Sequence, residues 1–154
     1  MPNLRVDFDI PTFSLWFIAQ RDIKAGEQFF YCYCQADRSV KERRRQLATY
    51  GFVCQCKACV NATPESDKLR EEKNDRLQKI FDEEEAMFAN PRFSIRSLDP
   101  LLELEKEIVK EGLDFGEKFV ELLIIIFQAY GKLKNRVKEM EYFNKAHKYR
   151  GQIN

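Results

Sequence analysis

The sequence predicts an α+β protein in which a small β-rich region, residues 1–62, precedes an all-helical region, residues 63–154. Three observations support this division. The first sixty residues contain short runs of alternating or aromatic and β-branched side chains, which are typical of strands. Three of the five cysteines lie together in CQCKAC, residues 54–59. Beyond Glu65 apolar residues recur every three or four positions, the period of an amphipathic helix.

The β-rich region contains three candidate strands and one helix. LRVDFD, residues 4–9, alternates apolar and polar side chains, and TFSLWFIAQ, residues 12–20, is a denser apolar run. IKAGEQFFYCYC, residues 23–34, has a turn at Gly26 followed by aromatic residues that suit a third strand. SVKERRRQLATY, residues 39–50, predicts a helix with a Ser39–Glu42 capping box, an inward Leu47 and a solvated basic surface.

The helical region is expected to contain four helices. The first begins at about Pro64 and breaks at Pro91, and the second has Pro100 in its first turn and stops at Gly112. The third and fourth span residues 115–133 and 136–150, and the short KLKN between them predicts a helical hairpin. Their expected buried stripes are Phe115, Phe119, Leu122, Leu123, Ile126, Phe127, Tyr130 and Leu133 in the third helix, and Val137, Met140, Phe143 and Ala146 in the fourth.

Composition narrows the classes of function. Twenty-six basic and 25 acidic residues leave a formal charge of +1, which gives no general electrostatic case for binding nucleic acid or an acidic membrane. The longest apolar run, FVELLIIIF, is too short to cross a bilayer, and no signal peptide is visible. The odd cysteine count favours reduced thiols and metal over disulfides, so we expect a cytoplasmic or nuclear protein.

The cysteine cluster is the strongest chemical signal. Cys54, Cys56 and Cys59 place three thiols within six residues, and this C-x-C-x-x-C spacing favours zinc ligands over inert buried cysteine. Structural zinc takes four ligands. The residues leave the fourth open: the candidates are Cys34, Cys32, His147, the single histidine, and water, with Cys34 the best local choice. With three thiolates the site is expected to hold zinc weakly.

Four stretches between residues 2 and 59 resemble one family. They are Pro2-Asn3, IAQRDIKAGEQFFYCY, RRRQLATYGF and CQCKAC. Together they resemble the C-terminal half of a SET domain followed by its post-SET zinc clip, as found in protein-lysine methyltransferases of the SET-and-MYND type and their fungal relatives. Beyond residue 59 the resemblance is generic, because the family continues into a helical region that is often tetratricopeptide-like.

The resemblance implies roles for individual residues. Tyr33 corresponds to the active-site tyrosine, Tyr50 would line the channel of the target lysine, and Phe52 would stack on the adenine of the cofactor S-adenosylmethionine. Asn3 ends the stretch that corresponds to the family's Asn-His-x-Cys-x-Pro-Asn motif, which binds the cofactor and supplies the fourth zinc cysteine.

Only Met-Pro-Asn of that motif occurs here, at residues 1–3. We therefore expect the chain to be the C-terminal portion of a protein-lysine methyltransferase that uses S-adenosylmethionine, inactive by itself, and either a fragment, a truncated gene model or a decayed copy. Its helical region would contact a protein substrate or partner, without direct contact to nucleic acid or membrane. The alternative is a non-catalytic helical interaction module with a vestigial zinc clip.

Overall fold

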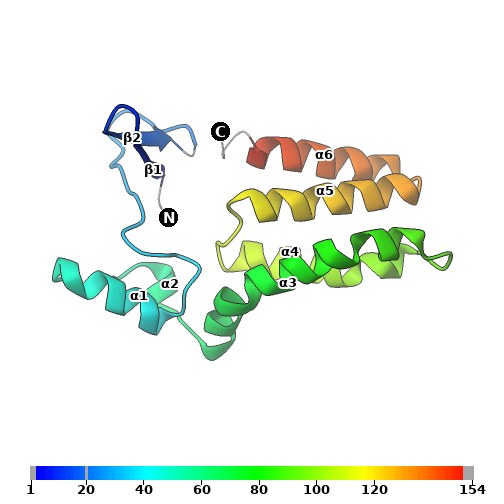
Figure 1. Cartoon of the computed structure of the whole chain (residues 1–154), viewed down its shortest axis with the longest axis horizontal. Coiled ribbons are helices and arrows are strands. Elements are labelled where there is room, and N and C mark those ends of the chain that lie inside the picture. Colours follow the sequence, from blue (N-terminus) through cyan, green and yellow to red (C-terminus); the bar gives the residue numbers. More distant parts are fainter. Residues whose placement is uncertain (1–2, 20, 151–154) are drawn as a thin grey trace. The chain divides into compact units, whose positions relative to one another are not determined.

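The computed structural model describes residues 3–19 and 21–150, which fall into two compact units, residues 1–67 and 68–154 (Figure 1). In the first unit, strand β1 (Leu4–Asp9) pairs antiparallel with β2 (Ser14–Ala19). The register runs from Leu4 opposite Ala19 to Asp9 opposite Ser14. The first two predicted strands are therefore confirmed, and they form a hairpin.

The third predicted strand, residues 23–34, is wrong: this segment consists of turns and irregular backbone. A strand ladder needs donors and acceptors that alternate along both partners. Here the amide groups of Asn3 and Leu4 both donate to one acceptor, the carbonyl of Phe30, at 2.8 and 2.9 Å. The backbone of the segment is thus bonded to the backbone at the start of β1 at Phe30 alone, instead of pairing along the strand.

The helical part of the first unit consists of α1 (Val40–Leu47), a 3₁₀ turn η1 (Ala48–Tyr50) and the single-turn α2 (Lys57–Val60). Ser39 is the N-cap residue, but its side chain makes no capping hydrogen bond, so the predicted capping box is wrong. Glu42 instead accepts hydrogen bonds from Arg45 and Gln46. Asp67 takes the capping role, because its carboxylate accepts the Val40 amide hydrogen at 2.8 Å.

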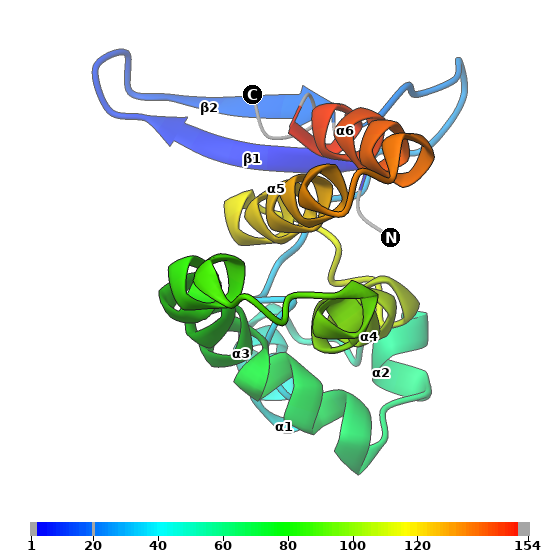
Figure 2. The same cartoon turned by 90° about the vertical axis from the view of Figure 1, so that its right-hand side faces the viewer.

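Four helices make up most of the rest of the chain. They are α3 (Pro64–Ala89), whose first turn belongs to the first unit, α4 (Asp99–Lys110), α5 (Glu117–Lys132) and α6 (Arg136–Arg150), with a 3₁₀ turn η2 (Ile95–Leu98) before α4. The breaks at Pro91 and Gly112 occur as predicted. The axes of the four helices run alongside one another, seen from the side in Figure 1 and end on in Figure 2. Their shared core includes the fully buried Leu77, Leu98, Ile108, Leu122, Leu123 and Ile126.

The hairpin of α5 and α6 is confirmed, but the predicted buried face of α6 is wrong for three of four residues. Val137, Met140 and Phe143 are exposed, whereas Ala146 and the unpredicted Tyr142 are buried. Tyr142 faces inward because its hydroxyl donates to Glu105 of α4 at 2.7 Å. A tetratricopeptide-like repeat stays a prediction, since one hairpin does not establish a repeat array. Among the described residues no helix has both the length and the apolar character needed to cross a bilayer.

Candidate metal centre and aromatic cluster

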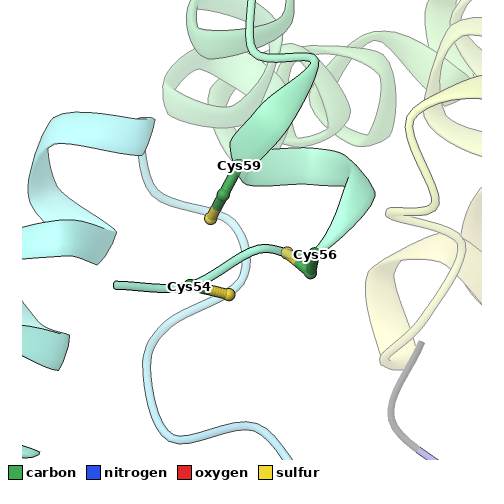
Figure 3. Close-up of side chains that lie close together, drawn as sticks. All are labelled: Cys54, Cys56 and Cys59. Carbon is green, nitrogen blue, oxygen red and sulfur yellow. The ribbon is translucent and has the colours of Figure 1, made fainter. Parts of the chain in front are cut away.

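The three clustered cysteines converge in space. Cys54 and Cys56 lie on the segment that leads into α2, and Cys59 lies within that helix. Figure 3 shows the three sulfur atoms facing a common space, and they all lie within 4.8 Å of one another. Cys59 is buried, Cys54 is half-buried and Cys56 is exposed, so the cluster has an open side.

This geometry fits zinc. Sulfur atoms that share one tetrahedral zinc ion lie about 3.8 Å apart, given Zn–S bonds of about 2.3 Å. Closing the cluster from 4.8 Å or less therefore requires only small movements of side chains. Burial raises the pKa of Cys54 to about 11. Burial opposes ionisation of Cys56 as well, but hydrogen bonds from the Cys54 and Cys59 thiols and from the Cys59 and Ala58 backbone amides together outweigh it and lower the pKa of Cys56. A lowered pKa favours the thiolate, which is the form that binds a cation.

None of the protein side chains considered as a fourth ligand joins this cluster. Within residues 3–19 and 21–150, the three cysteines form the one group of three or more potential ligands. Cys34 is half-buried, and its pKa is raised to about 12 by burial and by the neighbouring Cys32. Cys32 is exposed, and His147 is an exposed residue of α6. The identity of the fourth ligand stays a prediction.

Arg43 of α1 is a functional candidate that the sequence interpretation placed on a solvated surface, and that placement is wrong. Its side chain is buried, with an exposed fraction of 3%. The guanidinium donates to the carbonyl oxygens of Arg38 and Ala58, the latter at 2.7 Å, and lies 3.7 Å from the sulfur of Cys59. A signal was present: Arg43 precedes the buried Leu47 by four residues, so both lie on one face of the helix.

The aromatic residues singled out from the sequence also come together. The ring of Tyr33 lies 5.2 Å from that of Tyr50 and 6.2 Å from that of Phe52, both in edge-to-face geometry. Tyr31 extends the cluster, 4.4 Å from Tyr33, and links it to Phe17 of β2 at 5.8 Å. We call these five residues the aromatic cluster. Tyr31 and Phe17 were not predicted, although Tyr31 precedes Tyr33 by two residues and so shares its side of an extended chain.

The local backbone explains how two of these rings reach Tyr33. Leu47 anchors α1 in the core, and η1 then carries the chain to Tyr50. Gly51 follows with a φ of 71°, a left-handed conformation that glycine adopts without steric cost. This turn ends the helical segment between Tyr50 and Phe52. Both rings remain about half exposed, as does Tyr33.

Asn3 holds the segment that leads to Tyr31 and Tyr33. Its side chain is fully buried. The amide nitrogen donates to the Gln28 carbonyl at 2.9 Å and to Glu27 at 3.2 Å, while the amide oxygen accepts from the Phe30 amide at 2.7 Å. These bonds occupy the Asn3 side chain, so the structure shows a positioning role. Contact between Asn3 and a cofactor stays a prediction.

Comparisons with curated proteins show that the chain is similar to proteins named as lysine methyltransferases. The chain is 33% identical over 110 residues to histone-lysine N-methyltransferase SET5 of Saccharomyces cerevisiae, an alignment that covers 63% of this chain and 20% of that protein. SET5 of Scheffersomyces stipitis is 38% identical over 60 residues, 38% of this chain and 13% of that protein. Protein-lysine N-trimethyltransferase SMYD5 of Gallus gallus is 32% identical over 79 residues, 49% of this chain and 19% of that protein.

These relatives confirm the resemblance to SET-and-MYND-type lysine methyltransferases that the motifs indicated. The chain spans a fifth or less of the length of each of these three proteins. No family model matches the chain. No solved structure matches it either.

Proposed function

We propose that this chain contributes the lysine-binding aromatic cluster and the post-SET zinc clip to a protein-lysine methyltransferase that uses S-adenosylmethionine. The observation that carries the proposal is the convergence of Tyr33, Tyr50 and Phe52. These residues are separated by up to nineteen positions, yet Tyr33 makes ring contacts with both others. The relatives named as lysine methyltransferases support the same reaction class.

The exposed rings suit a lysine side chain. Aromatic faces attract ammonium groups and their methylated forms by cation–π interactions, and their apolar surface accommodates the lysine methylene groups. Bound S-adenosylmethionine would supply an electrophilic methyl group. The reaction then needs a neutral lysine amine aimed at that group, and much of the barrier reduction comes from alignment. The Tyr33 hydroxyl would accept a hydrogen bond from the amine, while Tyr50 would limit its lateral movement.

The cofactor fits this cluster in part. The ring of Phe52 is about half exposed, which leaves surface for stacking on a planar base. Asn3 fits less well as a cofactor ligand, because its amide is buried and hydrogen-bonded to the 27–30 segment. In this proposal Asn3 positions the backbone that carries Tyr31 and Tyr33. The zinc clip would fix Cys54 and thereby Phe52, two residues earlier.

A binding experiment tests the proposal directly. Histone peptides with unmodified or methylated lysine are titrated into the zinc-loaded chain, and the tyrosine ring resonances are followed by NMR. We expect shifts at Tyr33 and Tyr50, lost with Tyr33→Ala and retained with Tyr149→Phe. The same samples are assayed for transfer of a radiolabelled methyl group. Ring resonances that do not move would contradict the proposal, and robust Tyr33-dependent labelling would contradict the expectation that the chain is inactive by itself.

A second candidate function is a helical protein-interaction module. It is favoured by Val137, Met140 and Phe143, apolar residues of α6 that are spaced by three and exposed. A photo-crosslinking residue at position 137 would capture the partner, and adding Met140→Glu to that variant should abolish the capture without changing the helix content. A partner captured equally with and without Met140→Glu rules this surface out.

A further inference from the structure

The charged side chain of Arg43 is buried in the interior of the first unit. Its side chain is 3% exposed, although Arg44 and Arg45 beside it on α1 are exposed. The groups that contact its guanidinium are two carbonyl oxygens, of Arg38 and Ala58, and the sulfur of Cys59. No carboxylate of the described chain forms an ion pair with it.

Burying a cation without a neighbouring anion costs free energy of folding, so proteins usually pair such charges or leave them hydrated. Carbonyl oxygens satisfy hydrogen bonds but carry no net charge. The remaining contact, the Cys59 sulfur, becomes an anion when it binds a metal, because metal ligands are thiolates. The three thiolates of Cys54, Cys56 and Cys59 outweigh a divalent ion by one negative charge, and a fourth thiolate would add another.

We propose that Arg43 is the counter-charge of the cysteine cluster: it neutralises the excess negative charge of the zinc thiolates and orients Cys59 by an N–H···S hydrogen bond. This inference rests on the zinc site of the proposed function. Residues that contact metal ligands from outside the coordination sphere commonly change metal affinity roughly ten- to a hundredfold when they are replaced. Arg43 is thereby a positioning residue, and its contact with the Ala58 carbonyl holds α1 against α2 at the same time.

Two substitutions separate the charge from the hydrogen bonds. Arg43→Gln removes the charge but keeps a side chain that can donate to a carbonyl, and Arg43→Lys keeps the charge in a different shape. Arg44→Gln is the matched control, because it makes the same change at the neighbouring exposed arginine. Zinc affinity is measured for each full-length chain by competition with a chromogenic chelator. The sulfur-to-cobalt charge-transfer band of the cobalt-loaded protein gives a second readout.

We expect Arg43→Gln to weaken zinc binding by at least tenfold and to shift the cobalt band. Arg43→Lys should retain most of the affinity, and Arg44→Gln should stay within about twofold of the wild type. A purely structural role predicts a different pattern, in which helix content by circular dichroism falls and the two Arg43 variants lose affinity in proportion to that fall.

The outcomes are distinguishable. A wild-type chain that binds no zinc overturns the zinc site, and this inference with it. If the wild type binds zinc and Arg43→Gln binds it equally well, the counter-charge role alone fails. If Arg43→Gln does not fold, Arg43→Lys decides: a folded Arg43→Lys chain with affinity near that of the wild type supports the charge, and one that loses affinity tenfold overturns it.

Discussion

Glu105 of α4 offers the sharpest test of the helical unit. Its side chain is 6% exposed and accepts a hydrogen bond from the Tyr142 hydroxyl at 2.7 Å, as well as an ion pair from Lys145. This contact joins α4 to α6 across 37 residues of sequence. The carboxylate raises the pKa of Tyr142 in addition to the larger effect of burial. Glu105→Ala removes the carboxylate from both of its partners and leaves the buried Tyr142 hydroxyl without an acceptor.

The expected cost follows from the two contacts. Losing a hydrogen bond to a charged group costs about 1.5–3 kcal/mol, and this range includes the cost of leaving the buried hydroxyl unpaired. The Lys145 side chain is 33% exposed, so the ion pair is screened by solvent and adds only about 0–1 kcal/mol. We therefore expect Glu105→Ala to lower the free energy of unfolding by about 2–4 kcal/mol.

Urea denaturation followed by circular dichroism at the helix minimum measures this loss. Glu103→Ala, at an exposed position of the same helix, is the control and should cost less than about 0.5 kcal/mol. A double-mutant cycle with Tyr142→Phe should return a coupling of about 1–2 kcal/mol. If Glu105→Ala proves as mild as Glu103→Ala, or if the coupling is absent, the buried network does not hold α6 in place.

Three further predictions concern the core, pH and metal. Ile126→Asp places a charge in the fully buried core, so it should lower the free energy of unfolding by several kcal/mol. It should also abolish the protease-resistant fragment that we expect from residues 65–154. A fragment that survives this substitution would contradict the prediction. Arg21, Asn3 and the Lys24 amide lower the pKa of Glu27 to about 2, so its contribution to stability is complete at neutral pH and is lost as pH falls through that value. The difference between wild type and Glu27→Gln in the tyrosine resonances should therefore shrink as pH falls from about 4.5 to about 2, because the protonated carboxyl is as uncharged as the Gln amide, and a constant difference would refute this prediction. Removing zinc with a chelator should broaden the Tyr50 and Phe52 ring resonances and leave those of Tyr149 unchanged, whereas equal broadening at all three rings would contradict a local effect.

The features that the sequence predicted correctly are those that depend on residues close together in the chain. The proline and glycine that bound α3 and α4 act on their own turn of backbone, so those helix ends could be predicted. The cysteine cluster could be predicted because five residues of chain cannot place Cys54 far from Cys59. The approach of Tyr33 to Tyr50 was different: seventeen residues separate them, and only the family resemblance indicated that they meet.

Two of the wrong predictions, the third strand and the buried face of α6, have a common physical cause. In each, a polar side chain has a hydrogen-bond partner that lies far away in the sequence. The Asn3 side chain forms hydrogen bonds with the Gln28 carbonyl and the Phe30 amide, backbone groups that would have been paired in a third strand. Tyr142 turns α6 toward Glu105 and leaves Met140 outside. The spacing of apolar residues indicates which side chains avoid water, but it does not indicate which polar side chains have a buried partner.

The cysteine cluster and the aromatic cluster are linked by a very short stretch of chain. Phe52 precedes Cys54 by two residues, and Tyr50 precedes Gly51, whose left-handed backbone ends the helical segment. On the other side, Arg43 joins α1 to the Cys59 sulfur, and η1 continues directly from α1 to Tyr50. Residues 50–54 are therefore connected to the cysteine cluster at both ends, directly through Cys54 and indirectly through η1, α1 and Arg43. Zinc binding to thiolates would tighten both ends together, because it fixes Cys54 and Cys59 relative to each other. Metal binding should consequently order the rings of Tyr50 and Phe52, although neither ring contacts the metal. We therefore expect chelation to change the resonances of these two rings before it changes the helix content.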